Sequence, residues 1–489
     1  MHDLTAMNCG PYEIWGPISE GGMSRVWLAR HRELSTPAII KTLLDAPKDA
    51  YDRLRNEARL TARIPSPRVV RAVDVGVHET TPYLVEEYVD GVDLAELDRH
   101  RRAAMGRSLP LWFVCRVVDA VADGLESAHQ TGVIHRDVKP SNIFGSPQTG
   151  MRLGDFGIAT ARRSATDPSS GTLRFLAPEA LRGVSPTRRW DVYSLGVTAF
   201  DLYYGRPPFA TIAEIVGDAP VAFPAPRRPE EAYFQYTIAR MLERDPEKRF
   251  PTVKHPRRLL APLGRSLRPR LSGTTLVRGE FQLGPVRVRC RLGDIADSEV
   301  DGIINSANDE MRMRTGMGAA LRRRGGQEIE DEAMRGGRRA LGECIATGGG
   351  SLKCQKVLHA VSAWKEASCI ARATQRALML AEELGLRTLA IPALGAGTAK
   401  VTPESSAYAS ASALYWHVLM GGTKLREIEY VLFDRETFDL FIEELAAVFM
   451  GDGEHPDDEV DADADEAHAR DVALEATLDL RGLTRQPTR

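Results

Sequence analysis

Four polar side chains in one short stretch have the types and spacing that phosphoryl transfer requires. This reaction needs a held hydroxyl nucleophile, held metal ions and screened phosphate charge, and little covalent help from the protein. Asp137 can accept a hydrogen bond from an attacking hydroxyl, and Lys139 can lie near the transferred phosphate. Asn142 offers an uncharged oxygen to Mg²⁺, and Asp155 offers a charged one. An apolar helical pattern over residues 111–129 precedes them, and this helix must help to position them.

Two motifs in this stretch resemble those of protein kinases. Residues 135–142 read His-Arg-Asp-Val-Lys-Pro-Ser-Asn, and residues 154–157 read Gly-Asp-Phe-Gly. They are similar to the catalytic loop and the metal-binding motif of the bacterial-type (Hanks-type) serine/threonine kinases. The resemblance extends over residues 11–263 and implies a bilobal α+β kinase domain that uses ATP and Mg²⁺ to phosphorylate Ser or Thr in proteins, itself included. The residues that it implies are Asp137, Lys139 and Lys41 for catalysis, and Asn142 and Asp155 for the metal and the nucleotide.

The residues expected around the nucleotide come earlier in the chain. Residues 18–26 resemble the glycine-rich hairpin of kinases, with Ser19 in place of the first glycine and Gly21 as the one motif glycine that remains. Val26 fits the residue that covers adenine. An apolar strand pattern ends at Lys41 and resembles the motif Val-Ala-Ile-Lys, which implies that Lys41 binds the α- and β-phosphates.

Three glutamates and a valine complete the nucleotide site that the resemblance implies. Glu57 lies in a helical stretch and is the expected ion-pair partner of Lys41. Glu87 and Val89 fall in the hinge, which meets adenine through backbone groups. Glu86 aligns with the gatekeeper position, which is commonly apolar. Either its carboxylate forms a local hydrogen bond, or the alignment is one residue out of register.

Hydroxyl side chains are frequent in the segment that follows residue 157. Thr172 matches the threonine that contacts Asp137 and Lys139 in Ser/Thr-directed kinases, which favours Ser or Thr over Tyr as the substrate. A polar loop without a modification site is the alternative. The candidate phosphorylation sites are Thr166, Ser169, Ser170 and Thr172.

Several charged residues are expected to have architectural roles. In the kinase pattern, Glu179 pairs with Arg249, and Asp191 holds the backbone of the catalytic loop. His129 is expected to be a packed core histidine, and His135 is expected to hold the loop.

The pattern of the chain changes after residue 263. Residues 264–276 are polar and basic, with Gly and Pro interruptions, and are expected to form a linker. In residues 277–450, apolar strand runs alternate with helical stretches, which predicts an α/β/α three-layer domain. Asp294 and Ile295 follow the first of these strands, and the pair Asn305 and Asn308 ends the second.

Residues 277–450 resemble the macro domain, a binder of ADP-ribose. The resemblance rests on the sequence Val-Asp-Gly-Ile-Ile-Asn-Ser-Ala-Asn at residues 300–308 and on the Gly-Ala-Gly loop at residues 395–397. It implies contacts to adenine, to the distal ribose and to the diphosphate, the last through backbone amides of the loops. The implied residues are Asp294, Ile295, Asn305, Asn308, Gly316, Gly395, Ala396, Gly397 and Thr398.

Two departures concern the chemistry of this second domain. Hydrolytic macro domains carry an Asp after the first phosphate loop, and Gly318 occupies that position here. The aromatic residue that usually follows the second glycine loop is replaced by Ala399-Lys400-Val401. These departures argue against hydrolysis of ADP-ribosyl groups by the Asp-dependent route.

Bulk properties exclude several classes of protein. The 489 residues carry a net charge of −3. The tail, residues 451–489, holds twelve acids against four arginines and is expected to be disordered, so residues 1–450 carry only +5. Nucleic acid is therefore not favoured as a partner. The six scattered cysteines indicate reduced thiols. With neither a membrane span nor a signal peptide, we expect a cytoplasmic protein whose partners are protein substrates and ADP-ribose or ADP-ribosylated protein.

Three alternatives remain at this stage. The altered glycine loop and Glu86 are compatible with a pseudokinase scaffold. The second domain is compatible with an ADP-ribosyl hydrolase that works without the Asp. It is also compatible with a binder of RNA or another nucleotide.

Overall fold

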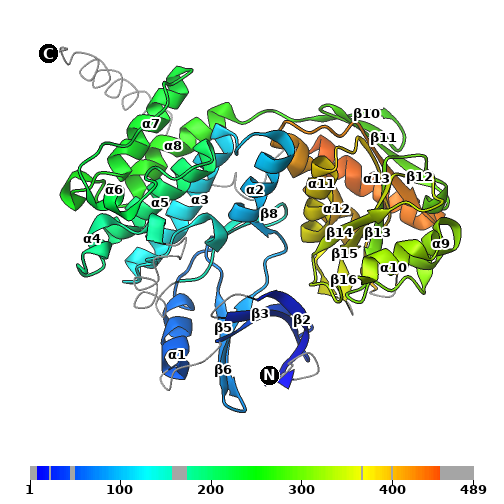
Figure 1. Cartoon of the computed structure of the whole chain (residues 1–489), viewed down its shortest axis with the longest axis horizontal. Coiled ribbons are helices and arrows are strands. Elements are labelled where there is room, and N and C mark those ends of the chain that lie inside the picture. Colours follow the sequence, from blue (N-terminus) through cyan, green and yellow to red (C-terminus); the bar gives the residue numbers. More distant parts are fainter. Residues whose placement is uncertain are drawn as a thin grey trace.

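The computed structural model describes residues 8–20, 24–43, 50–156, 173–364, 367–397 and 400–451. The first half of the chain forms two lobes, and the second half forms a domain that lies beside both of them (Figure 1). Several residues singled out in the sequence lie outside the described ranges. These are Gly21, Thr166, Ser169, Ser170, Thr172 and Thr398, together with the acidic tail.

The smaller lobe is a six-stranded sheet with one helix. The strand order is β1-β2-β3-β4-β6-β5, and neighbouring strands are antiparallel. Helix α1 packs on this sheet because Leu54 and Ala58, four residues apart, form one apolar face against Leu84. The elements are β1 (Asn8–Cys9), β2 (Tyr12–Glu20), β3 (Ser24–His31), β4 (Pro37–Leu43), α1 (Ala50–Thr61), β5 (Ala72–His78) and β6 (Thr81–Glu87).

The larger lobe is mainly helical and is built around the helix α3. Most of this helix is buried, as its apolar pattern predicts, and it packs against α5 and α8. A small three-stranded sheet, β7-β8-β9, contacts this helix. The polar loop of residues 135–142 leads directly into its strand β8. The elements are β7 (Val92–Asp93), α2 (Leu94–Met105), α3 (Leu111–Gln130), η2 (Pro140–Asn142), β8 (Ile143–Ser146), β9 (Gly150–Leu153), η4 (Leu173–Phe175), α4 (Pro178–Leu181), α5 (Arg188–Tyr204), α6 (Ile212–Val216), α7 (Pro229–Met241), η5 (Pro246–Lys248) and α8 (Lys254–Leu267).

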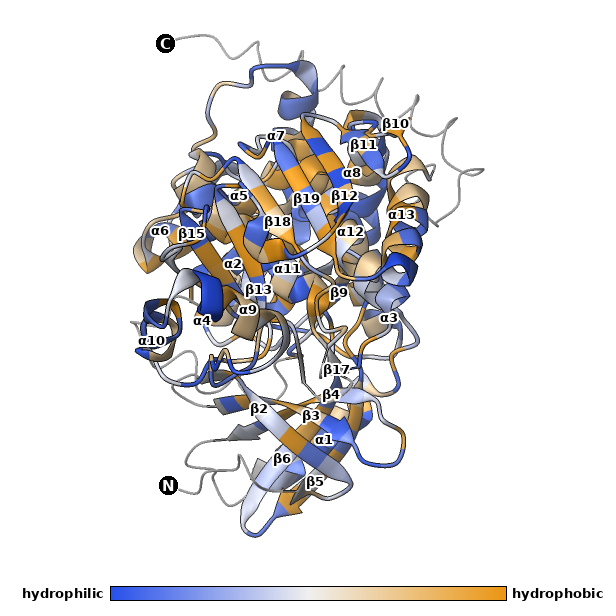
Figure 2. Ribbon diagram, turned by 90° about the vertical axis from the view of Figure 1, so that its right-hand side faces the viewer, coloured by the Kyte–Doolittle hydropathy of each residue, from blue (hydrophilic) through white to orange (hydrophobic). Residues whose placement is uncertain are grey.

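The second half is an α/β/α three-layer domain, which confirms the predicted fold class. Its eight-stranded sheet has the order β10-β11-β12-β19-β18-β13-β15-β14, with a parallel centre of largely hydrophobic strands (Figure 2). The elements are β10 (Gly273–Val277), β11 (Glu280–Leu283), β12 (Val286–Leu292), η6 (Ile295–Asp297), β13 (Gly302–Ala307), α9 (Gly316–Gly325), α10 (Glu328–Met334), β14 (Cys344–Gly348), β15 (Lys356–Val361), β16 (Ala363–Trp364), β17 (Ala367–Ser368), α11 (Ile370–Glu383), β18 (Thr388–Ile391), α12 (Pro403–Leu419), β19 (Glu427–Leu432) and α13 (Arg435–Met450).

The three layers follow from the alternation of side chains along the central strands. Successive residues of a strand point to opposite faces of the sheet. Ile304 and Leu358 therefore join the core under α11, α12 and α13, whereas Ile303 and Val357 join a separate core under α9 and α10. Both faces are buried, which is why these strands are largely apolar.

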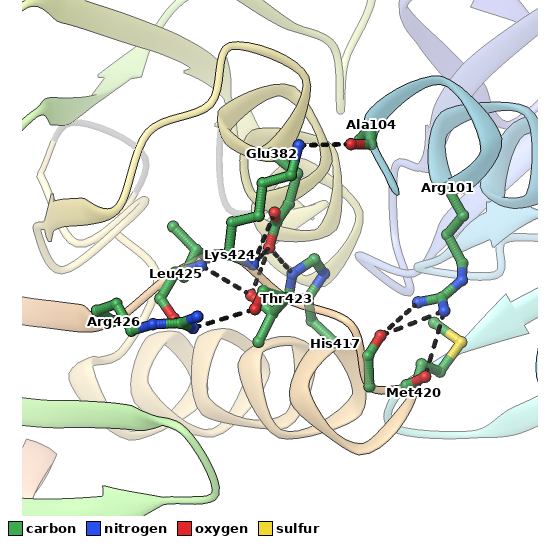
Figure 3. A network of polar contacts seen from close by, with 10 residues as sticks. Arg101, Ala104, Glu382, His417, Met420, Thr423, Lys424, Leu425 and Arg426 are labelled. Atoms are coloured by element: carbon green, nitrogen blue, oxygen red, sulfur yellow. Dashed lines mark hydrogen bonds and ion pairs between the residues drawn. The ribbon is translucent and has the colours of Figure 1, made fainter. Parts of the chain in front are cut away.

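The two halves share one continuous core at the face made by α2, α11 and α12. Phe113 of α3 contacts Trp416 of α12 in an edge-to-face arrangement, with ring centroids 5.4 Å apart. Gly145 is needed here, because a Cβ at this position would lie 2.7 Å from the Trp416 ring. Figure 3 shows part of the polar rim, where Arg101 donates to the carbonyl oxygen of Gly421 (3.2 Å) and Lys424 Nζ donates to that of Ala104 (2.6 Å).

A second contact joins the same domain to the smaller lobe. Trp15 and Leu28, from strands β2 and β3, share a buried cluster with Ala307 and Met311 of the second half. The domain thus packs against both lobes and against the segment that connects them. No helix among the described residues is long and apolar enough to cross a membrane.

Candidate functional site

The first candidate site is the loop of residues 135–142, which a buried carboxylate holds in place. Asp191 on α5 accepts hydrogen bonds from the backbone N–H of His135 (2.9 Å) and of Arg136 (2.8 Å). Its Oδ2 also lies 2.7 Å from Nε2 of His129. The sequence predicted this backbone support, and the contacts confirm it. Arg136 has a φ of +69°, a conformation that costs energy outside glycine, so these contacts hold the loop against strain.

His135 supports the loop as a neutral side chain. Its Nδ1 accepts a hydrogen bond from the N–H of Asp137 (3.2 Å), and its Nε2 donates to the carbonyl oxygen of Gly154 (2.9 Å). Burial lowers the pKa of His135, which keeps the tautomer that these two bonds require. The imidazole thereby ties the catalytic loop to the segment that carries Asp155.

The loop brings Asp137, Lys139 and Asn142 together. Lys139 Nζ donates to Oδ2 of Asp137 (2.7 Å), and Nδ2 of Asn142 donates to the same oxygen (3.1 Å). Oδ1 of Asp137 is buried, and it has no hydrogen-bond partner among the residues that the structure describes. A buried acceptor without a partner is costly, so this oxygen is suited to a donor that a substrate brings.

Lys41 of β4 has two carboxylate partners in the structure. Its Nζ forms ion pairs with Glu86 at 2.5 Å and with Asp155 at a shorter distance. Burial acts to lower the pKa of Lys41, but the two carboxylates outweigh it and raise that pKa well above the ordinary value. Lys41 also lowers the pKa of Asp155 against the effect of burial. The sequence predicted Glu57 as the partner of Lys41, and here the structure differs.

The sequence left open whether the Glu86 carboxylate forms a local contact or whether the alignment is one residue out of register. The ion pair with Lys41 supports the first interpretation. This carboxylate forms a local polar contact, and the alignment does not need to be shifted. Glu86 is buried, and it is the cross-strand neighbour of Ile39 in the β4–β6 ladder. Helix α1 keeps Glu57 close enough for its charge to affect this group, but the structure shows no ion pair between Glu57 and Lys41.

The other residues expected at the nucleotide lie on the strands and the connecting segment. Val26 of β3 is the cross-strand neighbour of Lys41. The carboxylate of Glu87, at the end of β6, pairs with Arg152 (2.9 Å), so its side chain has a structural partner. The carbonyl oxygen of Val89 accepts from Gly91 N–H (3.0 Å). For Ser19, the structure describes the backbone in β2 and not the side chain.

The donor set at the loop fits Mg²⁺. The Nδ2 group of Asn142 is bound to Asp137, which leaves Oδ1 for a ligand, and Asp155 adds a half-exposed carboxylate. Mg²⁺ is usually held by one or two such oxygens together with water and phosphate oxygens.

The second candidate site is a cleft of about 980 Å³ in the second half. It lies at the carboxyl ends of strands β12, β13, β18 and β19, where ligands commonly bind to open α/β sheets. We call it the Asn305 cleft, after the most buried polar side chain in it. Of the residues expected to bind ADP-ribose, those that line it are Asp294, Ile295, Asn305, Asn308, Gly316, Gly395, Ala396 and Gly397.

Asn305 presents a free oxygen to the cleft. Its Nδ2 donates to Nδ1 of His359 (3.0 Å), whose Nε2 lies 3.0 Å from the hydroxyl of Thr347. Burial lowers the pKa of His359 to about 4, so the ring is neutral and accepts at Nδ1. The amide is therefore fixed, and Oδ1 is buried with no hydrogen-bond partner in the described part of the chain.

Two other polar residues of the cleft are bound to neighbouring groups. Asn308 accepts from the backbone N–H of Arg312 (3.1 Å) and donates to the carbonyl oxygen of Arg312 (3.0 Å). Asp294 accepts from Ala296 N–H (2.9 Å), and its other oxygen lies 3.3 Å from Arg324. A ligand that uses either side chain must share it with these groups.

Sequence reasoning missed one conspicuous residue of the cleft, Phe433. This side chain is 90% exposed at the rim, directly after the buried strand β19. An exposed aromatic ring beside a cleft can stack on a base. The available signal was an aromatic residue at the carboxyl end of an apolar strand. Gly318 packs closely here, since a Cβ at this position would lie 3.3 Å from Cα of Met313 and 3.7 Å from Oδ1 of Asn305.

Comparison with known proteins agrees with this geometry. A family model described as the protein kinase domain matches residues 12–256, half of the 489 residues. The chain belongs to the protein kinase family. A second model, the macro domain, matches residues 304–409, which contain part of the Asn305 cleft.

Individual proteins with a similar sequence include bacterial serine/threonine-protein kinases. The serine/threonine-protein kinase PknB of Mycobacterium tuberculosis is 35% identical over 270 residues, which cover 50% of this chain and 41% of PknB. A probable serine/threonine-protein kinase of Clostridium perfringens is 32% identical over 262 residues, 50% of this chain and 37% of that protein. The chain thus spans about two fifths of the length of these relatives. A crystal structure of the Mycobacterium tuberculosis PknI kinase domain matches with 27% identity and a TM-score of 0.43, covering 54% of this chain and 99% of PknI's.

Proposed function

We propose that the kinase domain transfers the γ-phosphoryl group of ATP to Ser or Thr hydroxyls of proteins, its own included. The observation that carries this proposal is the free, buried Oδ1 of Asp137, in a loop that Asp191 fixes. This oxygen accepts a hydrogen bond from the substrate hydroxyl and orients it for attack. Lys139 lies beside it, where its charge screens the transferred group.

Nucleotide and metal are held by the residues around Lys41. Lys41 binds the phosphates that precede the transferred group, while Asn142 and Asp155 would hold Mg²⁺. When bound, Mg²⁺ neutralises charge on the phosphates. The similarity to PknB, which is named as a serine/threonine-protein kinase, supports the choice of Ser and Thr.

Phosphosite mapping of the purified chain tests this proposal. With ATP and Mg²⁺, we expect phosphate on Ser or Thr of the wild type and none on Asp137→Ala. Equal labelling of both proteins would indicate a contaminating kinase. The absence of label in every condition, with nucleotide still bound, would favour a pseudokinase scaffold. The altered glycine loop is the specific observation behind that alternative.

We further propose that the Asn305 cleft binds ADP-ribose, free or attached to protein. The cleft has room for a dinucleotide-sized ligand, a free amide oxygen in Asn305, an aromatic ring at its rim and backbone amides near Gly316 and Gly395. The positive end of α9 lies at Gly316 and suits a diphosphate. Gly318 supplies no carboxylate, which supports binding without hydrolysis.

Calorimetry shows which of the candidate ligands the Asn305 cleft binds. We expect ADP-ribose to bind and AMP to bind more weakly, because AMP lacks the distal ribose and the second phosphate. Tight binding of an RNA oligonucleotide without a response to ADP-ribose would overturn the proposal. Release of ADP-ribose from a modified protein would show a hydrolase instead.

Contacts between the halves support regulation of the kinase by this ligand. Ala307 lines the cleft and also packs in the cluster that contains Trp15 and Leu28 of the smaller lobe. Asn308 and Arg312 of the cleft flank Met311 in that cluster. A ligand that shifts this segment changes its packing on the lobe that carries Lys41. Phosphosite mapping with and without ADP-ribose measures the effect.

A further inference from the structure

The pairing between Lys41 and Glu86 is built into a single sheet. In the antiparallel β4–β6 ladder, Lys41 faces Leu84, and Ile39 faces Glu86. Lys41 and Ile39 lie on one face of β4, so Lys41 and Glu86 are diagonal neighbours on one face of the sheet. Their charged atoms are 2.5 Å apart, and Glu86 is only 7% exposed. The register of two central strands therefore fixes this contact.

Glu57 does not offer the same contact. Glu57 lies on α1, so the register of β4 and β6 does not set its position relative to Lys41. Its side chain is partly buried. Burial, and then the charge of Glu86, raise the pKa of Glu57 to about 8, although Lys41 opposes this effect. Burial raises the pKa of Glu86 as well, but Lys41 opposes this effect through its charge and through a direct contact that Glu57 lacks.

Asp155 is the remaining partner of Lys41, and it has another task. Its carboxylate is one of the two proposed metal ligands, and 42% of its side chain is exposed. Glu86 has no such second role. Apart from Lys41, no side chain among the described residues forms an ion pair or a hydrogen bond with the Glu86 carboxylate.

We propose that Glu86 is the positioning residue for Lys41, in place of the helix glutamate Glu57. This inference rests on the proposed kinase function and names the residue that orients its phosphate-binding lysine. Because Glu86 and Lys41 belong to one sheet, the lysine is held whatever the position of α1. Activity then does not depend on a contact between α1 and Lys41.

Kinetics of three variants test the proposal. Glu86→Gln keeps the shape of the side chain and removes its charge, so we expect kcat/KM for ATP to fall by roughly tenfold or more, mainly through kcat. For Glu57→Gln we expect a loss of less than about threefold. Loss of the Glu86 charge allows Glu57 to ionise and to pair with Lys41, so the residual activity of Glu86→Gln should rise between about pH 6 and about pH 8. The double variant should lack this rise and be the least active.

The pH profile separates positioning from folding, because a merely destabilised protein gains no new ionisation from Glu57. A larger loss in Glu57→Gln than in Glu86→Gln would overturn the inference and leave the kinase function intact. If the wild type transfers no phosphate, the kinase proposal fails, and binding of Mg-ADP decides the inference instead. Calorimetry should then show weaker binding by Glu86→Gln than by Glu57→Gln, and the reverse order would contradict it.

Discussion

The Asp90 carboxylate accepts a hydrogen bond of 3.0 Å from the backbone N–H of Arg372, although the two residues are 282 positions apart in the chain. Its second oxygen accepts from the N–H of Ala371, also at 3.0 Å. Asp90 belongs to the segment that joins the two lobes of the kinase domain, and Arg372 lies in the first turn of α11. A residue of the kinase hinge region thus caps a helix of the macro domain.

We expect Asp90→Ala to weaken the docking of the macro domain. Loss of a helix cap costs about 0.5–2 kcal/mol, and here the cost falls on an interface between domains. Urea unfolding should show the macro domain separating earlier from the kinase domain. Thr402→Ala is the matched control, because Thr402 caps α12 through Ser405 N–H (3.3 Å) within the macro domain. A similar loss of docking in both variants would show that the cap of α11 has no special role.

A buried ion pair beside this cap gives a second prediction. Arg376 of α11 binds Glu96 of α2 through two hydrogen bonds, of 2.5 Å and 2.8 Å. Burial acts to raise the pKa of Glu96, but Arg376 outweighs it and lowers that pKa. The pair therefore stabilises the docked state at neutral pH, and this contribution is lost as the pH falls below the ordinary value for Glu.

We expect Arg376→Ala to cost about 3 kcal/mol, because it leaves a carboxylate buried without its partner. Glu96→Ala should also destabilise the chain, and the double variant should lose less than the sum of the two. The expected coupling energy is about 1–3 kcal/mol by denaturant unfolding. Additive losses would mean that the two side chains do not stabilise docking together.

Local patterns predicted the folds of both domains because their signals lie within single elements. The helical spacing of α3 and the apolar strands β13 and β15 depend only on neighbouring residues. The docking of the macro domain on the kinase domain depends on residues that are far apart in the chain, so no local sequence pattern predicts it. Phe113 and Trp416 look like ordinary core residues in the sequence, and only the structure shows that they contact each other across the domains.

In the candidate sites, too, the sequence predicted what depends on local spacing and missed what depends on distant contacts. The short loop carries Asp137, Lys139 and Asn142 at fixed spacing, so their proximity follows from the sequence. The partner of Lys41 does not, because it depends on the register between β4 and β6, which places Glu86 on the same face. Phe433 was overlooked because its importance comes from exposure at a cleft rim, which no local pattern reports.

That exposure makes Phe433→Ala a clean test of the Asn305 cleft. The side chain packs against little protein, so we expect the free energy of unfolding to change by less than about 0.5 kcal/mol. Stacking of an aromatic ring on a base contributes about 1–3 kcal/mol, so the Kd for ADP-ribose should rise about tenfold in calorimetry. Phe433→Tyr keeps the ring and should bind as the wild type does. Unchanged affinity in the alanine variant would place adenine elsewhere.

The raised pKa of Glu57, about 8 in the folded chain, makes stability depend on pH. Below its ordinary value of 4.5, the carboxyl group is protonated in both the folded and the unfolded chain and has no effect. Between these two values the unfolded chain releases the proton while the folded chain keeps it, so the free energy of unfolding falls as the pH rises. Above about pH 8, Glu57 is ionised in the folded chain as well, and the full cost of burying its charge lowers the free energy of unfolding.

Glu57→Gln removes this penalty because glutamine does not ionise. We expect the variant to match the wild type near pH 4.5 and to exceed it by on the order of 4 kcal/mol at pH 8. Urea unfolding across this range measures the difference, with the exposed Glu33→Gln as the control. A difference that stays constant with pH would mean that Glu57 is ionised throughout. It would then be free to compete with Glu86 for Lys41.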